Sequence, residues 1–522
     1  MSRWRIRRGL FPNLIPIILL LALSLSFYAD YTPDSTFITL RYAENFTNGR
    51  GLTFNPGEGA MASLPVESYD SLLWVLLSSP AYLVGTEPLV WIKFLGFILS
   101  ALTLLFLSRV ISIIFPNIPT HLTILPSIML AIHPGFLLHA LSGSSIPLFW
   151  FIFTLILYFI VRAENDKYGI ILGLLAGLIT FARVEGVIIT LAILIYYLLA
   201  HKPKTALNLF TFYLLFFLPL ITFRAMYYHE LVPNTYYVKA TLPLLQRIKL
   251  MGLPHIVDFI SQYHNIFLLL FTIVAGYFIF TKRKKLIILL VLSLTLIVVV
   301  LCISSLFEEL LVLGYPLFLL LSACGLIYLP NSLAKYNLRG HFTVYPLLLV
   351  YLALTTTFIV NNREVLREYL SKREEQREIA LWLRTYLGDG EMILTDNTGL
   401  IPFYSGLRTI DLRGYFDPAI ARYYYRHNYS TSYTDLLPPE KLAKINTVTK
   451  SYILNRLNCK YILLNKSSDA LNMFMDDKAF QNSCESIMEW DSYLLLKRAV
   501  AERSPRKPYR RQPPRSKSYI LY

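Results

Sequence analysis

Apolar runs of membrane-spanning length recur between Leu10 and Val360, separated by short polar connectors. Because a helix needs about 20 mostly apolar residues to cross the hydrocarbon core, this pattern is typical of a polytopic membrane protein. It predicts about eleven spans: a first one that ends near Tyr28, then approximately Leu89–Ile113, Leu122–Leu138, Ile146–Val161, Gly169–Ala182, Val187–Leu199, Leu207–Phe223, Ile266–Phe280, Leu286–Leu301, Leu310–Leu329 and Val344–Val360. Residues 1–360 are therefore expected to form one module of packed transmembrane helices.

The first apolar run follows four arginines, Arg3, Arg5, Arg7 and Arg8, which is also the charge order of a signal peptide. At about 18 residues it exceeds the 7–15 residues usual for a signal-peptide core. We therefore favour an uncleaved span with the N-terminus in the cytoplasm.

The apolar stretch Leu72–Val84 decides the parity of the spans. With about 13 residues and an internal Pro80 it is short for a span, and we interpret it as an amphipathic or re-entrant helix at the outer membrane face. Basic connectors then fall on the cytoplasmic side, around Arg162, Lys202, Lys282 and Arg339. If Leu72–Val84 crossed the bilayer, the cluster at Lys282 would lie outside, against the positive-inside rule.

This topology describes a multi-pass protein of the plasma or inner membrane. It places two long polar loops, 30–88 and 224–263, outside the cytoplasm. Residues 361–500 follow outside, with a charged helical pattern up to Leu387 and then short β-like runs in EMILTDN, RTIDLRG and KYILLN. We expect an extracytoplasmic α/β domain there, followed by a basic tail, 501–522, with the composition of a disordered segment.

The composition supports the membrane assignment, since 55% of the residues are hydrophobic and only 16% are charged, against about 25% charged in soluble domains. The net charge of +16 is explained by basic connectors and the tail, and no nucleic-acid reader fold is recognisable. In an extracytoplasmic domain Cys459 and Cys484 are candidates for a disulfide. No metal-ligand spacing is present.

The first outer loop carries the strongest candidates for chemistry. Asp30 and Asp34 follow a span exit, where a carboxylate is placed to act as a general base on an acceptor hydroxyl. Asp34 also precedes STFITLRYAENF, which makes helix capping an equal alternative. Arg41 is a candidate phosphate or carboxylate ligand, and Glu67 a candidate for holding the acceptor by its hydroxyls, with surface ion pairing and capping as the alternatives.

Two further groups of charges stand out. Arg183 and Glu185, in FARVEG, lie between two spans, where charges are costly and are paired or functional. The second outer loop contains Arg224 and Lys239 among other cations. They either reflect the tolerance of long loops for charge or bind an anionic group such as a lipid phosphate.

Four motifs in order resemble a known family. DSTFITLRYAENFTNGRGLTFNPGE followed by VESYDSLLW resembles the first-loop signature of GT-C-type membrane glycosyltransferases, in the branch of the mycobacterial terminal arabinofuranosyltransferase and its unassigned bacterial relatives. LITFARVEGVI, HELVPNTYYVKA and DNTGLIPFYSGLRTIDLRGYFDP resemble three later motifs of that branch. The matches run from about Asp34 to Asp417, which is most of the chain.

The resemblance implies a GT-C-like helical module that transfers a sugar from a polyprenyl-phosphate donor to an extracytoplasmic glycan, lipid or protein acceptor. It implies Asp34 as the base, while Asp30 and Glu67 are further catalytic candidates from their places in the first outer loop. Donor phosphate binding is expected of Arg183, Arg224, Lys239 and Arg41. Substrate binding is expected of Tyr42, Tyr69, Glu185, Asn234, Tyr236, Asp396 and Tyr404. No cofactor is required, and a divalent cation is compatible with the chemistry without being indicated.

The chain departs from the family pattern at two positions. Ser35 stands where a second Asp is common, and Ser145 replaces a Glu in the SGSSI segment. These departures keep open a non-catalytic glycan-binding relative as an alternative, and a lipid-linked glycan transporter is another. Transporters often show internal repeats, and no repeat is visible in this sequence. The sugar, the acceptor and the oligomeric state are not indicated.

Overall fold

The computed structural model describes residues 2–56, 65–163, 166–303, 309–333, 344–388, 390–430, 436–457, 459–468, 473–475 and 477–499. The chain divides into two compact units. We call Met1–Thr47, Tyr69–Leu231 and Leu244–Leu370 the helical unit, and Asn48–Ser68, Val232–Pro243 and Ser371–Tyr522 the α/β unit. The two long polar loops, 30–88 and 224–263, therefore each contribute residues to both units.

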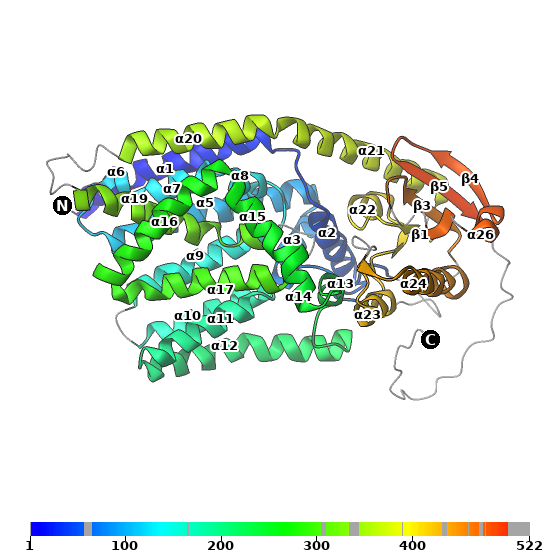
Figure 1. Ribbon diagram of the computed structural model, residues 1–522, viewed down its shortest axis with the longest axis horizontal. Helices are drawn as coiled ribbons and strands as arrows, with labels where there is room; N and C mark the ends of the chain where they lie inside the picture. Colours follow the sequence, from blue (N-terminus) through cyan, green and yellow to red (C-terminus); the bar gives the residue numbers. More distant parts are fainter. Residues whose placement is uncertain are drawn as a thin grey trace. The chain divides into compact units, whose positions relative to one another are not determined.

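The helical unit is built almost entirely of helices (Figure 1). Its α-helices are Ser2–Phe27 (α1), Asp34–Thr47 (α2), Leu72–Ser78 (α3), Pro80–Val84 (α4), Pro88–Ile114 (α5), Thr120–Thr123 (α6), Leu125–Ala131 (α7), Pro134–Ala140 (α8), Ile146–Arg162 (α9), Tyr168–Ala182 (α10), Gly186–Leu199 (α11), Pro203–Phe223 (α12), Leu244–Arg247 (α14), Leu253–Ser261 (α15), Tyr263–Lys282 (α16), Ile287–Ile303 (α17), Glu309–Val312 (α18), Tyr315–Leu333 (α19) and Val344–Asn361 (α20). The described part of this unit also contains two π-helical turns, Arg224–Tyr228 (η2) and Ile248–Gly252 (η3), and a 3-10 turn, Lys284–Leu286 (η4).

Five helices among the described residues are long and apolar enough to cross a membrane: Pro88–Ile114, Pro203–Tyr228, Tyr263–Lys282, Lys284–Cys302 and Val344–Asn361. Six shorter apolar helices accompany them. The chain is thus a mostly helical protein with several candidate spans. The total of about eleven spans, and the side of the membrane on which each loop lies, stay predictions.

Two of the expected spans are not continuous helices, and one of them is Leu310–Leu329, which is divided between α18 and α19. The other, Leu122–Leu138, is divided among α6, α7 and α8, and both later helices carry a proline in their first turn, Pro126 and Pro134. Proline lacks an amide hydrogen and favours the start of a helix over its interior. The expectation of a single helix here is wrong because these prolines start new helices.

The helices pack closely where glycines form a stripe. Gly169, Gly173 and Gly177 recur every four residues on α10, so they share one face of the helix. A Cβ atom at Gly169 would lie 2.5 Å from the carbonyl oxygen of Thr205, and one at Gly173 would lie 2.5 Å from that of Leu209, both on α12. Small residues at this stripe let the backbones of α10 and α12 approach, as in other membrane helix pairs.

The α/β unit contains a five-stranded sheet. Its strands are Met392–Thr395 (β1), Arg408–Asp411 (β2), Tyr461–Asn465 (β3), Cys484–Glu489 (β4) and Tyr493–Arg498 (β5), in the order β2-β1-β3-β5-β4. β1 is parallel to β2 and β3, and β5 is antiparallel to β3 and β4. The three predicted β-like runs are confirmed as β1, β2 and β3, and the hairpin of β4 and β5 was not predicted.

Helices cover both faces of this sheet (Figure 1). On one face Ile393, Leu463 and Leu495 pack with Ile379 and other apolar residues of Arg363–Leu387 (α21) and Leu400–Ser405 (α22). The alternate strand residues pack on the other face with Pro418–His427 (α23), Pro439–Ser451 (α24) and the π-turn Tyr452–Arg456 (η8). Burial on both faces explains why β3 reads as a continuous apolar run. Asn234–Lys239 (α13) and Lys478–Asn482 (α26) are two further helices of this unit.

The candidate disulfide between Cys459 and Cys484 is not formed. All four cysteines of the chain are free. Cys459 is buried just before β3, where its thiol donates to the carbonyl oxygen of Tyr461 at 3.2 Å, while Cys484 begins the edge strand β4. Burial raises the pKa of the Cys459 thiol to about 12, so this thiol is a packed core group.

Candidate functional site

The structure distributes the predicted site residues over the two units. The helical unit contains Asp30, Asp34, Arg41, Tyr42, Tyr69, Arg183, Glu185 and Arg224. The α/β unit contains Glu67, Asn234, Tyr236, Lys239, Asp396 and Tyr404. The geometry of each group is described within its own unit.

Asp34 is the first residue of α2 and is half-buried. A carboxylate in the first turn of a helix is stabilised by the helix dipole and by amide groups that have no partner within the helix. The predicted helix over STFITLRYAENF is therefore confirmed, and its apolar side is buried in the helical unit. Asp30, by contrast, is exposed and lies close enough to Lys93 for electrostatic interaction.

The first turn of α2 rests on the SGSSI loop. The hydroxyl of Thr36 donates to the carbonyl oxygen of Ser142 at 3.2 Å, and the indole Nε1 of Trp74 donates to that of Gly143 at 2.8 Å. Gly143 has φ +80°, and a Cβ there would lie 2.8 Å from Cγ2 of Thr36. The loop is thus fixed at a position that only glycine occupies without strain.

Both departures from the family pattern lie in these two segments. Ser145, buried, is the residue before α9, at the end of the loop that contacts α2. The hydroxyl of Ser35, next to Asp34, is buried without a hydrogen-bond partner. Buried hydroxyls normally find a partner, and an unpaired one requires an explanation.

Three tyrosines connect α2 to the end of α12. The rings of Tyr42 and Tyr69 meet edge to face at 4.9 Å between centroids. The hydroxyls of Tyr69 and Tyr228 lie 3.1 Å apart and are hydrogen-bonded. Tyr228 ends η2, whose first residue is the buried Arg224. This places two predicted substrate-binding residues in direct contact and connects them to the helix turn that contains a predicted phosphate ligand.

Arg183 and Glu185 form a buried ion pair. The guanidinium Nε and Nη2 atoms each donate to one carboxylate oxygen at 3.3 Å, and the two side chains are 3% and 8% exposed. Arg183 follows the last residue of α10 and Glu185 precedes α11. The two charges therefore neutralise each other, which was one of the two alternatives. A role of either residue in substrate binding stays a prediction.

A buried histidine lies near this pair and was not among the predicted site residues. Arg183 interacts electrostatically with His139. The His139 ring lies edge-on to Tyr31, 6.2 Å between centroids, and its Nδ1 is buried without a hydrogen-bond partner. Tyr31 precedes Asp34 by three residues. The signal in the sequence was only a histidine at the end of an apolar run, which is too common to indicate a role.

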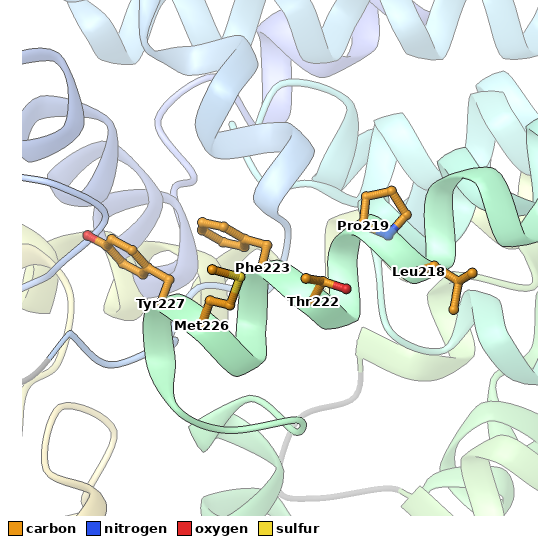
Figure 2. Close-up of a pocket in the computed structure, with 6 residues that line it drawn as sticks. All are labelled: Leu218, Pro219, Thr222, Phe223, Met226 and Tyr227. Carbon is orange, nitrogen blue, oxygen red and sulfur yellow. The ribbon is translucent and has the colours of Figure 1, made fainter. Parts of the chain in front are cut away.

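The apolar hollow on the helical unit has a volume of about 680 Å³. It is lined by residues of the end of α12 and the start of η2, as Figure 2 shows: Leu218, Pro219, Thr222, Phe223, Met226 and Tyr227. Arg224 lies in the same stretch of helix. An apolar hollow and a buried cation are thus neighbours along one helix.

In the α/β unit, three of the family-like motifs dock together. The side-chain amide of Asn234 donates to the carbonyl oxygens of Gly414 and Tyr415, both at 2.8 Å. Its main-chain N–H donates to the carbonyl oxygen of Glu67 at 3.0 Å, and the hydroxyl of Ser68 donates to Tyr415. The motifs VESY, PNTYYVK and DLRGYFDP therefore meet through main-chain groups. For Asn234 this gives a structural role beside the predicted one.

Asp396 and Tyr404 lie elsewhere in the α/β unit. Asp396 follows β1, and burial raises the pKa of its carboxyl group, which Ser468 approaches as a hydrogen-bond donor. The guanidinium of Arg377 lies over the Tyr404 ring, 5.3 Å from its centroid. The substrate-binding roles of Asp396 and Tyr404 stay predictions.

Asp411 supports the DLRGYFDP loop. Its two carboxylate oxygens accept the main-chain N–H groups of Arg413 at 2.8 Å and Phe416 at 3.0 Å. Burial nevertheless raises the pKa of Asp411 to about 6. Among the described residues, no group of three or more His, Cys, Asp or Glu side chains is placed to hold a metal ion.

Comparison with known proteins gives a fold and one domain of unknown role. Residues 364–512 match a family described as a domain of unknown function, DUF8728, which covers under a third of the chain. No curated protein matches the sequence. The match to DUF8728 therefore assigns no activity.

Three solved structures resemble almost the whole chain. ArnT from Cupriavidus metallidurans, bound to undecaprenyl phosphate, superposes with a TM-score of 0.60 at 10% identity and covers 94% of this chain and 99% of ArnT. The Archaeoglobus fulgidus oligosaccharyltransferase, tethered to an acceptor peptide, gives 0.58 at 14% identity, over 89% and 70%. The mycobacterial arabinofuranosyltransferase AftD gives 0.51 at 14% identity, over 96% of this chain but 40% of AftD. At these identities the likeness is one of fold.

Proposed function

We propose that this chain, which has the fold of the GT-C glycosyltransferases, is itself a membrane glycosyltransferase that uses a polyprenyl-phosphate sugar donor. The observation that carries the proposal is Asp34 at the first turn of α2, a turn that Thr36 holds against the loop of Ser142 and Gly143. A carboxylate on a rigid, packed element is held for chemistry more closely than one on a free loop.

Asp34 acts as the general base in this proposal. Its carboxylate takes the proton from an acceptor hydroxyl, and the acceptor oxygen attacks the anomeric carbon of the donor sugar. The bond between that carbon and the phosphate oxygen breaks, the electron pair leaves with the polyprenyl phosphate, and the configuration inverts. Because the leaving group is already a stable anion, cations near it replace a general acid.

The lipid tail and the phosphate have separate receptors on the helical unit. The hollow at the end of α12 is mainly apolar and suits an isoprenoid chain (Figure 2). Arg224, buried in the adjoining turn η2, suits the phosphate, since charge-assisted hydrogen bonds from guanidinium to phosphate are among the strong ones. In support, ArnT, whose fold this chain shares, was crystallised with undecaprenyl phosphate.

The acceptor is an extracytoplasmic glycan, lipid or protein, which follows from the predicted topology. Tyr42 and Tyr69 are proposed substrate contacts beside α2, because their rings meet and Tyr69 is hydrogen-bonded to Tyr228. Arg41, Arg183 and Lys239 remain proposed phosphate ligands.

A donor assay on the full chain in nanodiscs tests this proposal. Short-chain polyprenyl-phosphate pentoses and hexoses are supplied with envelope glycan acceptors, and release of polyprenyl phosphate is measured. Replacement Arg224→Gln is expected to lower kcat/KM by about ten- to a hundredfold, since hydrogen bonds to charged groups contribute about 1.5–3 kcal/mol. Arg162→Gln, at an exposed arginine that ends α9, is the matched control. Unchanged turnover in Arg224→Gln would remove the phosphate role from this residue, and no release from any donor would contradict the transferase assignment.

A further inference from the structure

The three consecutive tyrosines of α23 are used in two ways. Tyr423 and Tyr424 are buried in the core beneath the sheet. Tyr425 is half-buried and instead faces α13. Successive residues of a helix point about 100° apart. Three neighbouring side chains therefore cannot all face the core, and Tyr425 is the one that points away from it.

Helices α13 and α23 are neighbours within the α/β unit (Figure 1), and their rings form a small aromatic face. The centroid of Tyr425 lies 5.4 Å from that of Tyr237 and 6.1 Å from that of Tyr236. Tyr236 is 41% exposed. The face is therefore open to a ligand, whereas the neighbouring Tyr423 and Tyr424 are buried.

The two helices also carry cations. The guanidinium of Arg422 lies over Tyr237, 5.6 Å from its centroid, an arrangement in which the ring face attracts the positive charge. Arg426 is exposed one turn further along α23, and Lys239 ends α13. Neither helix contains an Asp or Glu residue, and the capping Asp417 is occupied by the N–H groups of Ala419 and Ile420.

We infer that this aromatic and basic face of α13 and α23 binds a glycan chain that carries acidic groups. Sugar rings present apolar C–H faces that stack on aromatic side chains, while phosphate or carboxylate groups pair with arginine. The identification of this glycan as the acceptor rests on the proposed function. The binding itself requires neither the donor nor Asp34.

A lipid surface fits this face less well than a glycan does. Segments that enter a membrane interface present Leu, Phe or Trp on their apolar side. On α13 and α23 the one large apolar side chain that is strongly exposed is Tyr236, which carries a hydroxyl group. Hydroxylated rings flanked by arginines suit a polar ligand with flat faces.

Binding is measured with the full chain in phosphatidylcholine nanodiscs by fluorescence anisotropy. The acidic probes are labelled tetragalacturonate and phosphorylated mannopentaose, and the neutral probe is maltotetraose. We expect an acidic probe to bind, with affinity lowered about three- to tenfold by Tyr236→Ala. Arg426→Gln should lower affinity for the acidic probe and leave that for maltotetraose unchanged. Tyr386→Ala, at an exposed tyrosine on α21 in the same unit, is the control and should bind as the wild type does.

Three results would overturn the inference: no binding of either acidic probe, equal loss in Tyr236→Ala and Tyr386→Ala, or binding that Arg426→Gln leaves unchanged. Binding of phosphatidylglycerol vesicles is measured in parallel, to test the alternative that the face binds lipid. If they bind through these residues and the oligosaccharides do not, the face is a lipid site. Because the assay contains no donor, its failure is independent of sugar transfer by Asp34.

Discussion

Asn55 and Thr409 are joined by two hydrogen bonds across 354 positions of sequence. The side-chain amide of Asn55 donates to the carbonyl oxygen of Thr409 at 2.7 Å, and the N–H of Thr409 donates back to Oδ1 of Asn55 at 3.0 Å. Thr409 lies on β2, one of the two edge strands of the sheet. One side chain thus pairs with main-chain groups that an edge strand otherwise leaves open.

Replacement of Asn55 by Ala is predicted to destabilise the α/β unit by about 1–3 kcal/mol, because both partner groups on Thr409 lose their hydrogen bonds. Hydrogen exchange of the β2 amides measures this change. Asn482→Ala, at the exposed end of α26, is the control and should leave exchange unchanged. Equal exchange in the wild type and Asn55→Ala would show that solvent replaces the side chain without cost.

The close contact of Gly143 with Thr36 predicts that a larger residue at position 143 disturbs the loop that contacts α2. Gly143→Ala is expected to destabilise the helical unit by about 1–3 kcal/mol and to lower transfer, because the new methyl group displaces Thr36. Gly85→Ala is a matched control, since Gly85 also has positive φ, +74°, but its Cβ would meet nothing within 4 Å. Thermal inactivation and kcat of both variants are compared. If the two variants lose the same amount, backbone strain alone is responsible and the contact with α2 is unimportant.

The buried ion pair of Arg183 and Glu185 predicts that a single replacement lowers the stability of the helical unit and that a double replacement restores most of it. Glu185→Gln alone leaves a buried guanidinium without its counter-charge, and breaking such pairs costs about 3–5 kcal/mol. A double variant, Arg183→Met with Glu185→Leu, should recover most of that stability. If the double variant is stable but does not transfer sugar, Arg183 acts on the donor as well as on Glu185. Full activity of the stable double variant would contradict its role as a phosphate ligand.

The buried Asp411 predicts a pH dependence. Burial raises its pKa to about 6 in the folded α/β unit, above the ordinary value of about 3.9 for an exposed aspartate. The folded state therefore binds the proton more tightly, so its stability is highest below about pH 4 and falls as pH rises through about 6, by about 1–3 kcal/mol. The raised pKa of Asp396 acts in the same direction.

Asp411→Asn should flatten part of that slope, measured as protection factors of the β1 amides between pH 4 and pH 7. The variant also loses one of the two acceptors for Arg413 and Phe416, so its overall stability should be lower at pH 7. Asp491→Asn, exposed in the β4–β5 turn, should leave the slope as it is. A wild-type stability that rises from pH 4 to pH 7 would contradict the assigned pKa.

The sequence predicted the elements better than their contacts. Runs of apolar residues located long helices such as α5, α12 and α16, and short β-like runs separated by turns located β1, β2 and β3, because these signals are local. The prolines that break the helix, Pro126 and Pro134, are visible in the sequence, but the continuous apolar run led to the prediction of a single span. The strand β4 was missed because its residues are mostly exposed and lack the apolar pattern of a buried strand.

The sequence located those residues of the candidate site that lie in a local motif. It did not locate those that are defined by contacts between distant segments. Asp34 was located by its position before a helix. The two-point pairing of Asn55, the docking of Asn234 on Tyr415 and the hydroxyl pair of Tyr69 and Tyr228 depend on segments far apart in the chain. No local pattern encodes such pairs. The resemblance indicated which motifs matter, and the structure shows that several of them hold one another in place.

Sugar transfer by Asp34→Asn tests the account most directly. With the full chain in nanodiscs and a polyprenyl-phosphate sugar that the wild type uses, we predict a loss in kcat of about 10²–10⁴, as expected for a lost general base, with donor binding retained. Asp30→Asn, at an exposed carboxylate four residues earlier, should keep most of the activity. If Asp34→Asn turns over as the wild type does, Asp34 is not the base, and Asp30 or Glu67 takes that role.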